Sequence, residues 1–172
     1  MRLVTFVHAG LQQTGWLLGD HVLPLAVVAN TAGLEMDISR VLAIIKSPKD
    51  KLEALSALYG RVAEFSSAYV PLAQLKLLAP IPNPVRNIFC VGRNYLDHIK
   101  EGLPGKPTEV ALPEVPQFFS KATHAVNAPN GDVRLDTSLT SKLDYEVELA
   151  VVIGRGGRDI SKAAAFDHVF GY

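Results

Sequence analysis

The stretch from Asp144 to Gly154 constrains the fold of this chain strongly, because polar and apolar residues alternate along most of it. Side chains of a β-strand point alternately to its two faces, so the alternation predicts a strand. One face is apolar and consists of Tyr145, Val147, Leu149, Val151 and Ile153. The other face begins with Asp144, Glu146 and Glu148. The apolar run at 151–153 predicts burial on both faces at the end of the strand.

Glu146 and Glu148 face the same side of this predicted strand, about 6 to 7 Å apart. Two carboxylates at that distance repel each other when they are partly buried, and a hard divalent cation such as Mg²⁺, Mn²⁺ or Ca²⁺ relieves the repulsion. The pair is therefore a candidate metal site. A solvated edge strand with an acidic outer face explains the same pattern, because acidic residues on strands are mostly exposed.

The composition is that of a globular protein, and it restricts the class of function. Lys and Arg together number 17, as do Asp and Glu, so the charge gives no indication of a nucleic-acid or anionic-membrane partner. Cys90 is the single cysteine, which rules out an internal disulfide and favours a reducing compartment. No apolar run approaches the roughly 20 residues that cross a bilayer, and the first residues lack the apolar core of a signal peptide. We expect a soluble, cytoplasmic protein.

The first 79 residues are predicted to form a small α+β domain, and we recognise no catalytic or metal-binding motif in them. Strands are predicted at Leu3–Val7 and in a hairpin over Gly15–Leu25 that turns at a Gly-Asp pair. A short helix is predicted within Leu34–Ile45, and Ser47 is predicted to cap a second helix. Apolar residues at helical spacing predict the buried face of that second helix: Leu52, Leu55, Leu58, Val62 and Phe65.

Three prolines then follow within the five residues Pro80–Pro84. Proline removes a backbone donor and fixes the chain in an extended form, so this stretch predicts a linker. We therefore expect one domain over residues 1–79 and a second over residues 80–172.

A short buried strand is predicted at Ile88–Val91, just after the linker. A polar turn or short helix follows it, in which His98 and Glu101 are three residues apart. On a helical turn this spacing places both side chains on one face, where a carboxylate fixes the tautomer of the imidazole and raises its basicity. The pair is thus a candidate general base. An ordinary surface His–Glu pair explains the same spacing.

Three motifs in series closely resemble those of the fumarylacetoacetate hydrolase superfamily. They are Val-Gly-Arg-Asn-Tyr-x-Asp-His-x-x-Glu at 91–101, Phe-x-Lys at 119–121, and Asp-Tyr-Glu-Val-Glu-Leu at 144–149 with a later Ile-Gly. The resemblance covers Asn87 to Tyr172, and the preceding residues resemble, less specifically, the accessory domain that many members carry. It implies an α+β, mainly β fold, with a mixed β-sandwich roll after the small N-terminal domain, usually in a homodimer.

The resemblance also implies a metal site. Glu146 and Glu148 would be two ligands of Mg²⁺ or Mn²⁺, or of Ca²⁺ as in some members. The third ligand of the family is an Asp soon after the Gly-Tyr that matches Gly171-Tyr172, and a catalytic lysine lies further on. We therefore expect the chain to be a fragment or a truncated product. Val91 stands where the tyrosine-pathway member has a further Asp ligand, which favours the branch of acylpyruvate hydrolases and oxaloacetate decarboxylases.

The same resemblance implies catalytic and substrate-binding roles for five residues of these motifs. His98, oriented by Glu101, would deprotonate the water that attacks a carbonyl of the substrate. Lys121 would hold a substrate carboxylate or oxyanion, and Arg93 and Tyr95 would bind the substrate. The expected activity is metal-dependent hydrolysis of a carbon–carbon bond in a small 2,4-dioxo acid such as an acylpyruvate or fumarylpyruvate.

Two other classes of function stay open. On the same scaffold the protein would be a decarboxylase, isomerase or hydratase of 2-oxo or enol acids. Without a third metal ligand it would be a catalytically inactive fragment or a binding module. The segment Lys100–Gln117, rich in proline, is predicted to be either a lid over the substrate or a plain surface loop. Cys90 is predicted to be a core residue.

Overall fold

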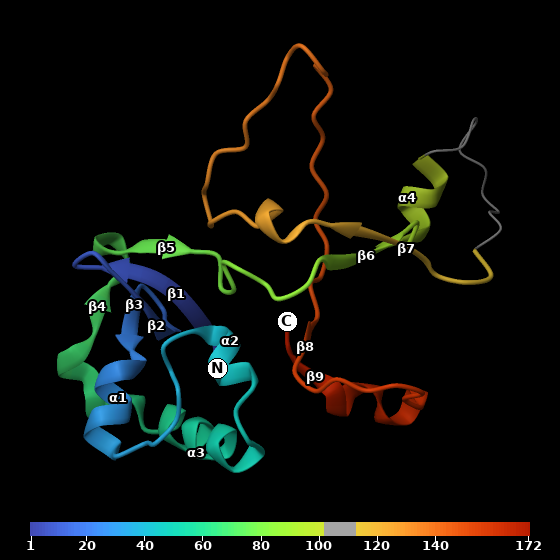
Figure 1. Ribbon diagram of the computed structural model, residues 1–172. Helices are drawn as coiled ribbons and strands as arrows, with labels where there is room; N and C mark the ends of the chain where they lie inside the picture. The colour runs from blue at the N-terminus through green and yellow to red at the C-terminus, as the bar shows by residue number, and fades with distance from the viewer. Residues whose placement is uncertain (102–112) are drawn as a thin grey trace. The chain divides into compact units, whose positions relative to one another are not determined.

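The structure is a computed structural model that describes residues 1–101 and 113–172, with only the backbone described at Glu101. Its residues form two compact units (Figure 1). Unit 1 consists of Met1–Pro82 together with Ala128–Tyr172, and unit 2 consists of Asn83–Asn127. The division into domains of residues 1–79 and 80–172 stays a prediction.

Unit 1 begins with a five-stranded antiparallel sheet. Its strands are β1 (Leu3–His8), β2 (Leu11–Leu18), β3 (His21–Pro24), β4 (Val70–Pro71) and β5 (Lys76–Leu78). They lie in the order β4-β3-β2-β1-β5 (Figure 1). The predicted first strand and hairpin are confirmed. Gly19 makes the turn between β2 and β3 with a φ of 60°, a left-handed conformation that favours glycine.

Three α-helices and two 3₁₀ segments complete this part of unit 1. They are α1 (Leu25–Ala32), α2 (Val41–Ile45), α3 (Lys49–Tyr59), η1 (Val62–Ala68) and η2 (Leu72–Gln74). Sheet and helices share one buried core made by Trp16, Leu23, Leu25, Val28, Ile44, Leu55, Leu58 and Phe65. Burial of each such large apolar side chain is worth about 1.5 to 3 kcal/mol. This core holds the N-terminal part of unit 1 together.

The apolar stripe predicted for the second helix is confirmed, because Leu55, Leu58 and Phe65 are buried in this core and the other two members pack against it. The predicted cap is wrong. The Ser47 hydroxyl donates to the Ala43 carbonyl at 3.1 Å, and a proline takes the N-cap position of α3 without a side-chain bond.

The short helix expected within Leu34–Ile45 is shorter than predicted and covers only Val41–Ile45. The residues before it turn instead, with the Asp37 carboxylate accepting from the backbone N–H of Ser39 at 2.9 Å. Helix α1 was not predicted, because its apolar sequence continues the hairpin without a polar break. Gly33, with a φ of 64°, ends that helix and is the sequence signal that points to it.

Unit 2 is a two-stranded antiparallel ribbon with one short helix. Strand β6 (Ile88–Gly92) pairs with β7 (Gln117–Lys121), and α4 (Leu96–Glu101) and η3 (Thr123–Ala125) flank them. The predicted strand at Ile88–Val91 is confirmed, but its predicted burial is wrong except at Cys90, which is 6% exposed. A ribbon of two strands has no second layer within unit 2 to bury the rest. Most of the predicted lid, residues 102–112, lies outside the described residues.

The C-terminal part of unit 1 contains β8 (Val152–Ile153), η4 (Lys162–His168) and β9 (Val169–Gly171), and β8 pairs with β9. The strand predicted from Asp144 to Gly154 forms only at Val152–Ile153 and is wrong for the residues before them. Those residues are exposed, and no strand among the described residues pairs with them. The predicted burial of Val151 and Ile153 is likewise wrong, since they are 49% and 59% exposed.

Ser161 caps η4, because its hydroxyl accepts from the backbone N–H of Ala164 at 3.3 Å. The helix ends at His168, where the backbone enters β9. His168 is buried, and its Nδ1 is hydrogen-bonded to the Arg155 carbonyl at 2.8 Å, which links the end of η4 to the loop after β8.

The mixed α+β class is confirmed. The described residues form separate sheets of five, two and two strands, so a complete sandwich roll stays an expectation. Among the described residues, no helix has the length and apolar character needed to cross a membrane.

Candidate functional site

Helix α4 carries the candidate base. Its first hydrogen bond runs from the backbone N–H of Ile99 to the Tyr95 carbonyl at 3.1 Å. Ile99 is 4% exposed and anchors the helix, while its neighbour His98 is exposed and open to a ligand. Glu101 lies three residues after His98 and closes the helix. The predicted placement of these two residues on one helical turn is therefore confirmed at the level of the backbone.

Arg93 joins β6 to α4 in a left-handed conformation, with a φ of 53°. A side chain other than glycine pays about 1 to 2 kcal/mol for this conformation. The residue turns the chain sharply from strand into helix and lies at the edge of a hollow within unit 2. That hollow is lined by Val91, Gly92, Arg93, Asn94, Pro113, Val115 and Pro116. Asn94 was not among the predicted site residues, although it stands inside the Arg-Asn-Tyr motif that could have singled it out.

Lys121 ends strand β7 and pairs with Ile88 of β6 in the antiparallel register. Its side chain is exposed, and its ammonium group lies 5.9 Å from the centroid of the Phe119 ring. A cation at this distance is attracted weakly by the face of an aromatic ring. Tyr95, which precedes α4, is 48% exposed. Arg93, Tyr95, His98 and Lys121 thus all belong to unit 2 and are all accessible from solvent.

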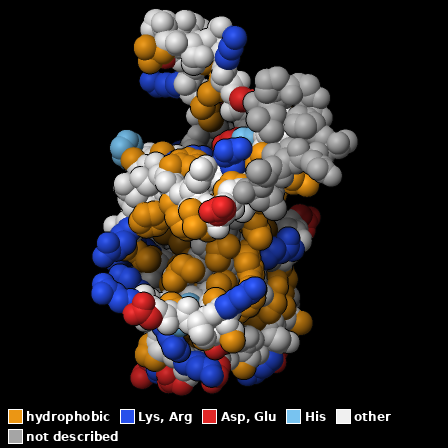
Figure 2. Space-filling view, turned by 90° about the vertical axis from the view of Figure 1, so that its right-hand side faces the viewer, with side chains coloured by type: hydrophobic (Ala, Val, Ile, Leu, Met, Phe, Trp, Pro, Cys, Tyr) orange, Lys and Arg blue, Asp and Glu red, His pale blue; other side chains and the backbone are white. Residues whose placement is uncertain are grey.

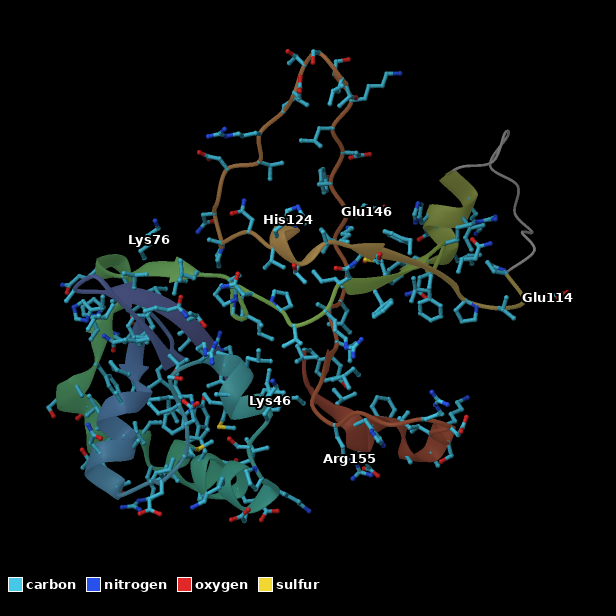
Figure 3. All side chains as sticks on the ribbon, in the orientation of Figure 1. Lys46, Lys76, Glu114, His124, Glu146 and Arg155 are labelled. Carbon is cyan, nitrogen blue, oxygen red and sulfur yellow. The ribbon has the colours of Figure 1, made fainter. Side chains whose placement is uncertain are left out.

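Glu146 and Glu148 lie on the extended segment of unit 1, and Figure 3 labels Glu146 on this segment. Both side chains are exposed. Among residues 1–101 and 113–172, no group of three or more His, Cys, Asp or Glu side chains is arranged so as to hold a metal ion. The described residues supply two carboxylates and not a complete ligand set, so they do not by themselves fit the Mg²⁺ that the resemblance implies.

The described residues whose pKa values are clearly shifted lie outside the candidate site. Hydrogen bonds from the hydroxyl and the backbone N–H of Ser138 lower the pKa of Asp136, at the turn before the extended segment. A two-pronged hydrogen bond from Arg61 lowers the pKa of Glu64. Both carboxylates thus accept hydrogen bonds from residues two or three positions away in the sequence.

A family model described as "Fumarylacetoacetate (FAA) hydrolase C-terminal" matches residues 87–172 of the chain. The matched stretch takes in unit 2 from β6 onward and the extended segment with Glu146 and Glu148. The candidate residues of both units therefore lie inside the matched stretch.

Several curated proteins are similar to the chain. Oxaloacetate tautomerase YisK of Bacillus subtilis (strain 168) is 47% identical over 109 residues, which are 63% of this chain and 35% of that protein. The mitochondrial oxaloacetate tautomerase FAHD2A of Homo sapiens is 35% identical over 120 residues, covering 70% of this chain and 36% of that protein. The same-named protein of Bos taurus is 31% identical over 178 residues, covering 100% of this chain and 51% of that protein.

A solved structure, the fumarylacetoacetate hydrolase of the psychrophile Exiguobacterium antarcticum, is similar in fold. Its TM-score is 0.64 at 29% sequence identity, and the similarity covers 99% of this chain and 53% of that chain. The chain thus spans about a third to a half of the length of these relatives.

Proposed function

The chain belongs to the fumarylacetoacetate hydrolase family, and from that membership we propose that it acts on small 2-oxo acids and interconverts their enol and keto forms. Oxaloacetate is the substrate that the similarity to named tautomerases supports. The observation that carries the proposal is the 47% identity with the tautomerase of Bacillus subtilis. Because the chain spans only part of each relative, the activity is proposed for the domain to which these residues belong.

An isomerase is better supported than the carbon–carbon bond hydrolase that the motifs alone favour. The three curated relatives described above are named tautomerases, whereas a hydrolase is named by the family description and by the similar solved structure. Tautomerisation moves protons and leaves the carbon skeleton intact. It needs fewer groups than hydrolysis, since no water has to be placed against a carbonyl carbon.

His98 is the residue to which we assign the proton transfer. When the enol form becomes the keto form, C3 gains a proton and the hydroxyl on C2 loses one. An imidazole exchanges protons near neutral pH and is suited to delivering the proton to C3. Its exposure on α4 leaves the ring accessible to substrate, and Glu101 on the same helical turn is assigned the role of orienting it.

Lys121 and Arg93 are assigned to the carboxylates of the substrate. A dianion such as oxaloacetate offers two carboxylate groups, and charge-assisted hydrogen bonds to them are stronger than neutral ones. Lys121 would act as a point charge, while the planar guanidinium of Arg93 can donate two parallel hydrogen bonds. Tyr95, half-exposed before α4, is assigned to the substrate as well.

Glu146 and Glu148 remain proposed ligands of Mg²⁺ or Mn²⁺. The proposal rests on the match of the family model and on the preference of these cations for carboxylate oxygen. The proton transfer itself is assigned to His98. A homodimer and a cytoplasmic location remain proposals of the same kind.

The proposal is tested with the protein expressed from its complete gene. Conversion of enol oxaloacetate into the keto form is followed by the loss of enol absorbance in the presence of Mg²⁺. We expect a protein-dependent acceleration that falls about a hundredfold in His98→Ala. His124→Ala is the matched control, because His124 is also exposed in unit 2 and has no assigned role. A rate equal to that of buffer would reject the tautomerase.

Hydrolysis of an acylpyruvate is the second candidate, favoured by the similarity in fold to a named hydrolase. The same preparation is incubated with acetylpyruvate, and release of pyruvate is measured. Hydrolysis without tautomerisation would reverse the order of the two candidates. Absence of both activities would favour a catalytically inactive binding module.

A further inference from the structure

The two faces of the β6–β7 ribbon in unit 2 differ in exposure. Alternate residues of a strand share a face, and the antiparallel register places Cys90 opposite Phe119 on one of the two faces. Cys90 is 6% exposed and Phe119 is 45% exposed, whereas Phe89 and Phe118 on the other face are 71% and 67% exposed. The face that carries Phe119 is therefore the more sheltered one.

Polar side chains lie at both ends of this sheltered face. Lys121 stands at one end, and its ammonium group lies 5.9 Å from the centroid of the Phe119 ring. Gln117, which is exposed, lies two residues before Phe119 on the same face of β7. Figure 2 shows exposed hydrophobic side chains with Lys and Arg side chains among them on the face that it presents. Along β7, the aromatic ring is thus flanked by a cation on one side and by a neutral amide on the other.

Gly92 keeps the sheltered face open beside Gln117. The register of the ribbon places Gly92 directly opposite Gln117. A Cβ on Gly92 would lie 3.5 Å from the Gln117 carbonyl oxygen and 3.8 Å from the Phe119 ring, so a side chain there would occupy this face. The glycine therefore leaves the Gln117 end of the face accessible to a ligand.

The hollow of unit 2 begins at the same end of the ribbon. Gly92, Arg93 and Pro116 are among its lining residues, and Pro116 directly precedes Gln117. The volume of the hollow is about 220 Å³, which is below the roughly 300 to 1,000 Å³ of pockets that take drug-sized ligands. Arg93, which we assign to a substrate carboxylate, and Gln117 are thus neighbours at a hollow whose size suits a small acid.

The amide of a glutamine suits an oxygen whose hydrogen-bonding character changes. In the proposed reaction, the oxygen on C2 is a hydroxyl in the enol form and a carbonyl in the keto form. The hydroxyl can donate a hydrogen bond, whereas the carbonyl only accepts one. Lysine and arginine side chains only donate, but a glutamine amide carries both an acceptor oxygen and a donor NH₂ group. Gln117 can therefore bind both tautomers, which the basic residues of the site cannot do equally well.

We propose that the amide of Gln117 binds the C2 oxygen of the substrate and makes the site selective for acids that carry an oxygen at this position. Lys121 and Arg93 hold the carboxylates. This assignment rests on the proposed function, since it takes a 2-oxo acid as the substrate. It adds a specificity-determining residue that lies outside the three sequence motifs, and the sheltered face of the ribbon is the observation that carries it.

The test compares two unreactive dicarboxylic acids on the protein expressed from its complete gene. Malate carries a hydroxyl on C2, and succinate has the same four carbons without that hydroxyl. Binding of each acid is measured by calorimetric titration without divalent cations, so that neither turnover nor a metal ion contributes. We expect the unmodified protein to bind malate about three- to tenfold more tightly than succinate, because one further hydrogen bond is worth about this factor.

In Gln117→Met the preference for malate should disappear while the affinity for succinate stays unchanged, which also shows that the variant is folded. Lys121→Met should weaken the binding of both acids equally. Ser120→Ala is the matched control, because Ser120 is exposed on the opposite face of β7 and has no assigned role.

A preference for malate that persists in Gln117→Met would overturn the proposal. Equal binding of the two acids by the unmodified protein, or binding of neither, would overturn it as well. A preference that depends on Gln117 in a protein that does not tautomerise oxaloacetate would support the binding role of Gln117 and reject the proposed reaction alone.

Discussion

The ammonium group of Lys121 lies 5.9 Å from the centroid of the Phe119 ring, two residues earlier on the same strand. Both side chains face the same side of β7, since alternate residues of a strand share a face. The ring face attracts the exposed ammonium group weakly near the end of the ribbon. It gives a physical reason for the Phe-x-Lys spacing, in which the ring supports the cation that we assign to a substrate carboxylate.

Replacement of Lys121 by methionine should raise KM for oxaloacetate about tenfold or more, because a charge-assisted hydrogen bond contributes about 1.5 to 3 kcal/mol. Methionine is unbranched and nearly as long as lysine but carries no charge. Steady-state kinetics of Lys121→Met and Lys121→Arg check this prediction, with partial retention of affinity expected in the arginine variant. An unchanged KM in Lys121→Met would remove Lys121 from the substrate site.

Replacement of Arg93 by glycine should separate folding from substrate binding. Glycine adopts a φ of 53° without the strain that arginine bears, so thermal stability should be equal or higher. Loss of the guanidinium should at the same time weaken binding of a dicarboxylate. Thermal unfolding and calorimetric titration with oxalate are the measurements. Unchanged oxalate affinity in a folded Arg93→Gly variant would contradict the assignment.

Gly15 on β2 is required by packing and not by its backbone angles. A Cβ there would lie 2.5 Å from Val22 Cγ1 and 2.9 Å from the Leu23 carbonyl oxygen. Since the carbonyl is fixed in the sheet, Gly15→Ala should lower the free energy of unfolding by about 1 to 3 kcal/mol. Gly156→Ala serves as the control in urea unfolding, because its Cβ would meet no atom within 4 Å. Equal unfolding midpoints for the two variants would contradict the close packing of β2 against β3 at Gly15.

The exposed carboxylate of Glu64 should titrate below its ordinary pKa because Arg61 donates hydrogen bonds to it. Two hydrogen bonds, at 2.8 and 2.6 Å, lower the pKa of Glu64 below its ordinary value. A lowered folded-state pKa means that the pair's stabilisation is present above the unfolded pKa and is lost as the pH falls through the folded pKa. In Arg61→Ala, the pKa of Glu64 measured by NMR should rise. The pKa of Asp37, which is lowered by Ser39, should not move.

Local patterns in the sequence were sufficient for much of the N-terminal fold. The hairpin was predictable from the turn at Gly19, and the buried face of α3 from the spacing of its apolar residues. Both signals come from residues that are close together in the sequence. The cap at Ser47 failed because its hydroxyl has an alternative acceptor one turn back, in Ala43. Such competition depends on geometry that a sequence motif does not contain.

At residues 144–151, by contrast, the local pattern was not sufficient to predict the structure. Its alternation predicted a strand, but a strand is stabilised by its neighbours and not by its own sequence. The described residues provide a partner only for Val152–Ile153. The candidate site residues were named from the resemblance of short, local motifs to those of the family, and their roles stay predictions. Their relation to Glu146 and Glu148 depends on tertiary structure and remains a prediction.

Deuterium incorporation at C3 of oxaloacetate tests the central claim most directly, since it reports the proton transfer assigned to His98. The protein expressed from its complete gene is incubated with oxaloacetate in D₂O, and loss of the C3 proton signal is followed by NMR. We predict exchange faster than in buffer for the unmodified protein and close to the buffer rate for His98→Gln. Equal exchange rates in the two proteins, or a rate equal to that of buffer in both, would contradict the account.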